Sequence, residues 1–254
     1  MSLRGKVALV TGGSRGIGRS VAIALAEEGA HIAINYLRNQ NAAEQTSRKI
    51  RKFGKRVILL RRNVANPDDV KAMFQEIRGA FGRLDVFVHS ASLGSFKPLI
   101  ELNPLQIDRM FDINARAFVT CSQEARRLMR GGGIVIAISS LGSQRFIHGY
   151  GGIAIAKACL EAAVRYLAVE LAPFRIRVNA VSGGAINTEG LRSFPNYQDR
   201  KKECIAKTPY RRLGRPEDIA NIVRFLCQDA SSWICGQTIV ADGGLSLPLL
   251  SLRS

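Results

Sequence analysis

The sequence predicts an α/β fold in which one doubly wound parallel β-sheet carries helices on both faces. Short runs of β-branched and apolar residues alternate along the whole chain with longer segments whose apolar residues recur at helical spacing. No linker, internal repeat or low-complexity segment interrupts this alternation. We therefore expect one domain over residues 1–254, for which 46% apolar residues provide ample core.

The N-terminal half of the chain provides four of the expected strands and three of the helices. Strands are expected where short apolar runs are bounded by turn residues, at residues 7–11, 31–35, 56–60 and 86–89. Helical spacing of apolar residues predicts helices at residues 20–28, 42–53 and 67–81. Gly29 ends the first helix and Pro67 lies at the start of the third, as helix boundaries favour.

The C-terminal half continues the alternation. Helices are expected at residues 104–129, 150–172 and 216–226, and strands at residues 133–139, 177–181 and 238–240. Residues 182–209 have mixed polarity with Gly and Pro, which is typical of a mobile loop with a short helix. The helix at 150–172 is apolar nearly all round, so its outer face needs a cover, most simply the same helix of a second subunit. We expect a homo-oligomer.

A glycine-rich turn, Gly12-Gly-Ser-Arg-Gly16-Ile-Gly18, connects the first strand to the first helix. Strand, glycine-rich turn, helix and strand form the start of a mononucleotide-binding unit, so the sheet is expected to be Rossmann-type. The glycines let the backbone turn tightly and approach a pyrophosphate at the positive N-terminus of the helix. This pattern predicts dinucleotide binding.

The end of the second strand distinguishes NAD from NADP. NAD-binding chains usually place an acidic residue there to bond the 2′-hydroxyl of the adenine ribose. This chain has no acid from Asn35 to Arg38, and Arg38 together with Arg15 can pair with a 2′-phosphate. We predict NADP(H), with two ordinary surface arginines as the alternative.

Tyr150 and Lys157 are seven residues apart in the predicted helix at 150–172. Seven residues is close to two helical turns, so both side chains leave the same face. The ammonium would favour the ionised phenol and lower the pKa of Tyr150, which makes this residue a candidate proton donor. From this pair alone, an ordinary tyrosine and an ordinary lysine remain the alternative.

The net charge of +17 attracts polyanions, namely nucleic acid, anionic membrane or an acidic protein. A solvated basic surface without a specific partner is the alternative. We expect no nucleic-acid partner, because the sequence has no supporting motif or aromatic platform. We expect no membrane partner, because no run of about 18 apolar residues exists.

The five cysteines are scattered, odd in number and without C-x-x-C spacing, as is typical of reduced structural cysteines. We expect no metal site. The first strand follows directly after residues 1–6, which leaves no room for a signal peptide. These observations favour a cytoplasmic protein.

With these features together, the chain resembles the short-chain dehydrogenase/reductase family along essentially its full length. Thr11-Gly-Gly-Ser-Arg-Gly-Ile-Gly18 matches the family's Thr-Gly-x-x-x-Gly-x-Gly turn, and Gly236-Gln-Thr-Ile-Val-Ala-Asp-Gly-Gly244 matches its C-terminal signature. Asn114 lies where the family keeps a catalytic-site asparagine, and the resemblance suggests a tetramer. The turn and the resemblance together imply these cofactor-binding residues: Gly12, Ser14, Arg15, Gly16, Ile17, Gly18, Arg38, Asn63, Val64, Ser90, Ala91, Lys157, Ile186 and Thr188.

The active-site spacing departs from the usual pattern of this family. The usual tyrosine lies four residues before the lysine, where this chain has Ile153, which cannot donate a proton. The Tyr-x6-Lys spacing of Tyr150 and Lys157 is that of the enoyl-acyl-carrier-protein reductases within the superfamily. The surrounding sequence is most similar to the NADPH-dependent type III enzymes. Against that type, His89-Ser90 is a departure.

The resemblance implies reduction of the trans-2 double bond of an enoyl thioester on acyl carrier protein, as in fatty-acid synthesis, by hydride transfer from NADPH to Cβ. The carbonyl oxygen is then three bonds from the carbon that receives the hydride. Moving the tyrosine back three residues displaces its Cα by ~4.5 Å along the helix, a shift of the same scale as the distance between the carbon that receives the hydride and the carbonyl oxygen. Tyr150 would bond the enolate oxygen, Lys157 would bind the nicotinamide ribose, and Ser140 would bond the substrate or only form a turn.

The resemblance also places a substrate lid at about residues 187–212. Apolar residues on this lid, and one before Tyr150, would line an acyl tunnel or be plain packing residues: Phe146, Leu191, Phe194 and Tyr197. An acidic acyl carrier protein is the expected partner of the basic residues around the lid, which are Arg192, Arg200, Lys201, Lys202, Lys207, Arg211, Arg212 and Arg215.

Two other functions remain open. The first is a ketone or 3-ketoacyl-thioester reductase, which Asn114 and Ser140 favour and Ile153 disfavours. The second is a non-catalytic NADP-binding protein. The altered residues after the fourth strand support it, and the intact tyrosine–lysine pair weighs against it.

Overall fold

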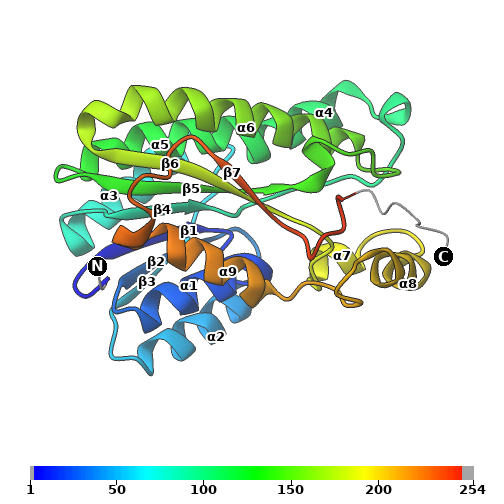
Figure 1. The fold of residues 1–254 in the computed structure, drawn as a ribbon. Helices are drawn as coiled ribbons and strands as arrows, with labels where there is room; N and C mark the ends of the chain where they lie inside the picture. The colour runs from blue at the N-terminus through cyan, green and yellow to red at the C-terminus, as the bar shows by residue number, and fades with distance from the viewer. Residues whose placement is uncertain (1–2, 248–254) are drawn as a thin grey trace.

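Within residues 3–247, which the computed structural model describes, seven strands form one sheet in the order β3-β2-β1-β4-β5-β6-β7 (Figure 1). The strands are β1 (Val7–Thr11), β2 (His31–Tyr36), β3 (Val57–Arg61), β4 (Val86–His89), β5 (Gly133–Ser140), β6 (Ile176–Gly183) and β7 (Thr238–Ala241). All neighbouring strands are parallel, so the predicted α/β class is confirmed. Of the predicted domain, residues 1–2 and 248–254 lie outside the described residues.

Helices cover both faces of the sheet (Figure 1). One face carries α3 (Pro67–Phe81), α5 (Ala117–Leu128) and α6 (Gly151–Leu171), and the other carries α1 (Gly16–Glu27), α2 (Gln40–Arg51) and α9 (Pro216–Leu226). The remaining helical elements are α4 (Pro104–Phe111), α7 (Glu189–Arg192), α8 (Tyr197–Lys207), and the 3₁₀ turns η1 (Leu99–Glu101), η3 (Leu141–Ser143), η4 (Ala172–Phe174) and η5 (Asp229–Ser231). None of the described helices has the length and apolar character to cross a membrane.

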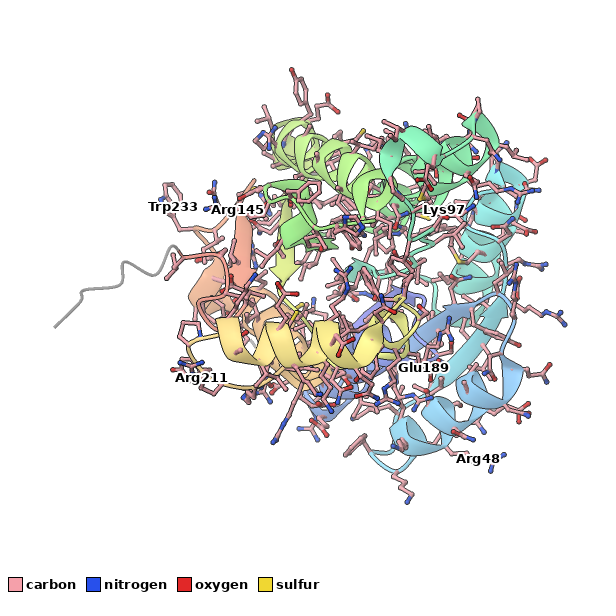
Figure 2. All side chains as sticks on the ribbon, turned by 90° about the vertical axis from the view of Figure 1, so that its right-hand side faces the viewer. Arg48, Lys97, Arg145, Glu189, Arg211 and Trp233 are labelled. Atoms are coloured by element: carbon pink, nitrogen blue, oxygen red, sulfur yellow. The ribbon has the colours of Figure 1, made fainter. Side chains whose placement is uncertain are left out.

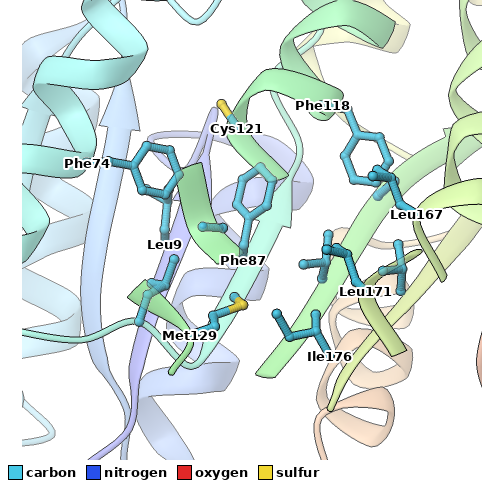
Figure 3. Close-up of a cluster of buried hydrophobic side chains, with 14 of the residues drawn as sticks. Leu9, Phe74, Phe87, Phe118, Cys121, Met129, Leu167, Leu171 and Ile176 are labelled. Atoms are coloured by element: carbon cyan, nitrogen blue, oxygen red, sulfur yellow. The ribbon is translucent and has the colours of Figure 1, made fainter. Parts of the chain in front are cut away.

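Strands β1 to β6 send alternate side chains into two separate hydrophobic cores, because successive residues of a strand point to opposite faces. Leu9 and Phe87 face α3, α5 and α6, and the Phe87 ring lies 6.4 Å from the rings of both Phe74 and Phe118 (Figure 3). Val10 enters the other core, against α1 and α9. Burial on both faces explains why the central strands are apolar without alternation.

The helix predicted over residues 104–129 is interrupted by a π-helical turn, η2 (Asp112–Arg116). Asn114 is buried in this turn, and its Nδ2 donates to the backbone oxygens of Met110 (2.9 Å) and Leu93 (2.8 Å). In an α-helix each backbone N–H bonds the carbonyl oxygen four residues earlier. The Asn114 side chain bonds this oxygen, on Met110, and so competes with the backbone N–H and loosens the α-helical turn. The apolar spacing continues through the turn, so the sequence pattern does not reveal it.

The sequence predicts a loop with one short helix over residues 182–209, whereas the structure has the end of β6 and two helices there. Thr188 starts α7, because its Oγ1 accepts a hydrogen bond from the backbone N–H of Leu191 (3.3 Å). Asn196 in the left-handed region, with φ of 54°, precedes α8. The mixed polarity of this segment therefore belongs to two short helices without buried residues, not to a continuous loop.

The carboxyl ends of the parallel strands share one edge of the sheet, and α7 and α8 lie beyond this edge (Figure 1). β1 has β2 on one side and β4 on the other, so the connections that follow β1 and β4 run to opposite faces. Such a switch point opens a crevice at the carboxyl edge, where α/β sheets bind ligands. Ser140, the last residue of β5, lies at the same edge, and so does the start of α6.

Candidate active site

A cleft of about 2190 Å³ runs along the carboxyl edge of the sheet. Figure 2 looks onto this edge, with Arg145 and Glu189 on opposite sides of the opening. The cleft brings together all the predicted catalytic and cofactor-binding residues: Gly12, Ser14, Arg15, Gly16, Ile17, Gly18, Arg38, Asn63, Val64, Ser90, Ala91, Ser140, Tyr150, Lys157, Ile186 and Thr188. Asn114 is not among the lining residues, because its amide is engaged with Met110 of α4 and with the segment after β4, where it donates to Leu93 and accepts from the Ser92 hydroxyl (2.6 Å).

The glycine-rich turn is packed so closely that side chains are excluded at two positions. A Cβ on Gly12 would lie 2.9 Å from the Cα of Ala91, and a Cβ on Gly18 would lie 2.3 Å from the backbone oxygen of Gly12. At the start of α1, Arg15 makes no side-chain capping bond and the first turn holds no acid. The backbone N–H groups and the positive end of this helix are thus available to a pyrophosphate, which fits a dinucleotide.

The adenosine end of the cleft holds the two arginines expected to select NADP. Arg38 is exposed in the cleft beyond β2, and no carboxylate occurs between residues 35 and 39. Arg15 instead pairs with Glu189 of α7, with Nη1 and Oε2 separated by 2.6 Å. Asn35 is buried and donates to the backbone oxygen of Arg62 (2.9 Å), so it ties β2 to the segment that carries Asn63.

The sequence predicts Tyr150 inside the helix at 150–172, but in the structure Tyr150 lies immediately before α6. Burial raises the pKa of the Tyr150 phenol, and the neighbouring Ser140 side chain lowers it by a smaller amount. The prediction that Lys157 lowers the pKa of Tyr150 is therefore wrong in this structure. The Nζ of Lys157 donates to the backbone oxygen of Ile138 (2.7 Å), and burial dominates at the phenol.

Lys157 is a buried ammonium at the floor of the cleft. Burial lowers its pKa from 10.5 to about 8, and Glu161, one helical turn further along α6, opposes this change. An ammonium has three N–H donors, of which one bonds Ile138. Two donors remain for a ligand in the cleft.

Ser140 ends β5 with an extended backbone, and its Oγ accepts a weak hydrogen bond from the N–H of Gly142 (3.3 Å). The Tyr150 ring packs against the same glycine, since a Cβ on Gly142 would lie 2.4 Å from a ring carbon of Tyr150. Ser140 therefore forms the turn that the sequence predicts for it, and it lies beside Tyr150 in the cleft; bonding of the substrate by Ser140 stays a prediction.

Ile153 fills the position four residues before Lys157 with a buried apolar side chain. It packs in a small cluster with Leu102 and Met110, away from polar partners. No proton donor is present there, as the sequence predicts.

His89 has a structural role that sequence reasoning missed. Its Nε2 lies 3.0 Å from the backbone oxygen of Ile113, which only accepts, so Nε2 carries the proton. Its Nδ1 therefore accepts from the Thr11 hydroxyl (3.1 Å), whose oxygen accepts from the N–H groups of Ser90 and Ala91. Burial lowers the pKa of His89 to about 3. A neutral histidine thus joins the ends of β1 and β4 to η2.

Two aromatic rings, those of Phe96 and Phe194, stack with the ring of Tyr150 in the cleft. The ring centroids of Phe96 and Phe194 are 3.7 Å apart, and those of Tyr150 and Phe194 are 5.9 Å apart. The Arg200 guanidinium lies 4.5 Å from the Phe194 ring on its other side. No sequence signal singles out Phe96. Of the predicted tunnel residues, the cleft lining includes Phe146, Leu191 and Phe194 but not Tyr197.

Comparison with known proteins agrees with this geometry. A family described as Enoyl-(Acyl carrier protein) reductase matches residues 12–246. 1-Cyclohexenylcarbonyl-CoA reductase from Streptomyces collinus is 39% identical over 246 residues, which are 96% of this chain and 88% of that protein. A short-chain type dehydrogenase/reductase from Mycobacterium marinum superposes with a TM-score of 0.91 at 33% identity, over 97% of this chain and 98% of that chain.

The chain belongs to the short-chain dehydrogenase/reductase family. A further structure, of 7α-hydroxysteroid dehydrogenase complexed with NADH and 7-oxo glycochenodeoxycholic acid, superposes with a TM-score of 0.91 at 32% identity, over 95% of this chain and 94% of that chain. The family relationship and the glycine-rich cleft together make the protein an NAD(P)-dependent oxidoreductase.

Proposed function

We propose that this short-chain dehydrogenase/reductase reduces the trans-2 double bond of an enoyl thioester with NADPH. The position of the phenol carries the proposal. Tyr150 meets Ser140 ahead of α6, while the position three residues later holds the buried and apolar Ile153. A relative whose name gives a coenzyme A thioester as its substrate, 1-cyclohexenylcarbonyl-CoA reductase, supports the same class of chemistry.

Tyr150 is the hydrogen-bond donor in this mechanism. When bound, NADPH would supply a hydride to Cβ of the substrate, and negative charge would develop on the thioester oxygen. Tyr150 donates to that oxygen, and Ser140 orients the phenol. Because burial raises the pKa of Tyr150, the phenol keeps its proton at neutral pH. The enolate then takes a proton at Cα, which gives the saturated thioester.

Lys157 would bind the nicotinamide ribose with the two N–H groups that Ile138 leaves available. Its charge lies on the same side of the cleft as Tyr150 and would stabilise the developing enolate. Arg38 supports NADPH over NADH, because the end of β2 offers a guanidinium and no carboxylate to the ribose 2′ position. Arg15 can join it, since an exposed ion pair such as that with Glu189 is weak.

An acidic acyl carrier protein is the partner that the charge of the lid supports. Exposed basic side chains lie on α7, α8 and the following loop, and Lys207 among them lines the cleft: Arg192, Lys202, Lys207, Arg211, Arg212 and Arg215. The outer face of α6 supports a homo-oligomer, because Tyr166 and Val169 are 71% and 76% exposed on it. A tetramer is our proposal for the assembly, and analytical ultracentrifugation tests it.

The proposed reaction is tested by NADPH consumption with a trans-2-enoyl thioester beside the matching 3-ketoacyl thioester. Turnover of the enoyl substrate alone is the expected result. Turnover of the ketone alone would instead support a carbonyl reductase, the second candidate. That candidate draws on the likeness to a hydroxysteroid dehydrogenase whose structure holds a 7-oxo steroid. NADPH binding without turnover of either substrate would support a non-catalytic protein.

A further inference from the structure

Glu161 is a buried carboxylate that the mechanism above does not use. It lies on α6 one helical turn after Lys157, and its residue surface is 6% exposed. Its Oε1 accepts hydrogen bonds from the hydroxyls of Ser139 (2.5 Å) and Ser143 (2.6 Å). Its Oε2 accepts from the side-chain amide of Gln144 (3.3 Å). A buried carboxylate is costly unless such donors and a nearby cation compensate it.

The donors to this carboxylate lie on both sides of Ser140. Ser139 precedes it at the end of β5, and Ser143 and Gln144 follow it in and after η3. The Ser143 hydroxyl is also 2.8 Å from the backbone oxygen of Ser140. The carboxylate of Glu161 thus fixes the turn at both ends, and with it Ser140, which lies beside Tyr150 in the cleft.

Two cations lie one helical turn from Glu161 on α6. Arg165 follows it, and its Nη1 donates to the backbone oxygen of Glu161 (3.2 Å); the buried cation is the Lys157 ammonium, which precedes it. The other titratable groups around this ammonium are the phenol of Tyr150, at the start of the same helix, and the imidazole of His89 on β4. Burial keeps both of these groups neutral, because it raises the pKa of Tyr150 and lowers that of His89. Glu161 is the carboxylate that stabilises the charged form of Lys157.

We propose that Glu161 is a positioning residue of the active site, which holds the Ser140 turn in place and keeps the Lys157 ammonium charged. The inference rests on the proposed roles of Ser140 and Lys157, and it adds a residue that touches neither substrate nor cofactor. The two functions are separable, because the first depends on the shape of the side chain and the second on its charge.

Glu161→Gln tests the charge. The amide keeps the shape and one acceptor oxygen but removes the negative charge, so the pKa of Lys157 should fall further. Cofactor fluorescence measures NADPH affinity as a function of pH, and this affinity should decrease at alkaline pH as Lys157 loses its proton. The apparent pKa of this decrease, the alkaline limb of the profile, should fall by about one unit, which is a tenfold change in the titration constant. Glu170→Gln, an exposed change on the same helix, is the matched control and should leave the limb where it is. An unshifted limb in Glu161→Gln would overturn the proposal.

Glu161→Asp tests the geometry and also serves if Glu161→Gln is unfolded at assay temperature. The shorter side chain keeps the charge but withdraws the acceptor from Ser139 and Ser143. The alkaline limb should stay at the wild-type pH while kcat falls by about tenfold, as expected for a displaced positioning contact. Wild-type kcat in this variant would overturn the positioning role. NADPH affinity needs no substrate, so the charge test stands even if the enoyl thioester is not reduced.

Discussion

At the residue scale, the chemistry of the site depends on how each polar side chain is desolvated. Tyr150, Lys157 and His89 all lie at the carboxyl edge of the sheet, and burial shifts the pKa of each toward its neutral form. Only the lysine has a compensating carboxylate on the adjacent helical turn. The site therefore offers a protonated phenol as donor and one cation, which suits stabilisation of an enolate oxygen.

Replacing the phenol hydroxyl tests the donor. Tyr150→Phe should lower kcat for the enoyl thioester by about 10²–10³-fold, the usual effect of removing one donor to a developing oxyanion. NADPH affinity should stay at the wild-type value, because the ring and the glycine-rich turn are unchanged. Tyr210→Phe is the matched control, since Tyr210 is 76% exposed. Unchanged kcat in Tyr150→Phe would contradict the donor role.

The buried ammonium predicts a pH dependence of stability. The pKa of Lys157 is about 8 in the folded chain against an ordinary value of 10.5. Between these values the unfolded chain binds a proton that the folded chain lacks, so the free energy of unfolding should rise with pH. The rise attributable to this group is about 3 kcal/mol over that range.

Chemical denaturation from pH 7 to 10.5 measures this difference between the wild type and Lys157→Met. The variant should lack the part of the rise that Lys157 contributes. Lys202→Met, at an exposed position on α8, is the control and should follow the wild-type curve. Parallel curves for the wild type and Lys157→Met would show that Lys157 is not desolvated.

At the scale of elements, the cofactor cleft depends on close approach between the glycine-rich turn, the start of α1 and the segment after β4. Thr11 supplies the link, because its Oγ1 accepts hydrogen bonds from the N–H groups of Ser90 (3.2 Å) and Ala91 (3.3 Å). The same hydrogen bonds hold the backbone of Ala91 next to Gly12, where an added Cβ would lie 2.9 Å from the Cα of Ala91. A change in one segment is therefore transmitted to the other.

Gly18→Ala should disrupt this packing. Its Cβ would lie 2.3 Å from the backbone oxygen of Gly12, which cannot move aside as a side chain can. We expect a loss of about 1–3 kcal/mol in the free energy of unfolding and a loss of NADPH binding, measured by denaturation and cofactor fluorescence. Gly79→Ala is the control, because no heavy atom lies within 4 Å of a Cβ there and alanine in α3 should stabilise by about 0.5–1 kcal/mol. Wild-type NADPH binding in Gly18→Ala would refute this account.

At the scale of the whole molecule, the net charge of +17 acts over distances that individual contacts do not reach. Many ion pairs on the surface are exposed, such as those of Arg15 with Glu189 and Lys207 with Glu203. Exposed pairs contribute little stability. The charge is better explained by long-range attraction of an acidic partner to the lid than by stabilisation of the fold.

Salt should therefore weaken the reaction with the carrier protein. Raising ionic strength from about 0.01 M to 1 M shortens the screening length from ~30 Å to ~3 Å. kcat/KM for an enoyl-acyl carrier protein should fall over this range, whereas kcat/KM for an uncharged enoyl pantetheine thioester should not. Lys202→Glu on α8 should lower the first value at low salt, and Lys71→Glu on α3 is the control. Equal salt dependence of the two substrates would exclude electrostatic docking.

The sequence by itself determined the sheet, its alternation with helices and the location of the glycine-rich turn. These features depend on local patterns: apolar runs, helical spacing, and glycines where Gly12 and Gly18 leave no room for a Cβ. It also named the residues that meet in the cleft, because the carboxyl ends of parallel strands share one edge. Tyr150 and Lys157, which the spacing pairs, line the same cleft as Ser140, which the family resemblance names.

Only the tertiary structure decided the electrostatic state of these residues and the partners that support them. The pKa of Tyr150 rises because burial outweighs any effect of the lysine, and no spacing rule measures burial. The π-turn around Asn114, the tautomer of His89 and the role of Glu161 each depend on contacts between segments far apart in the chain. Such contacts form only when the sheet and its helices are assembled, since desolvation and hydrogen-bond geometry are properties of the packed site.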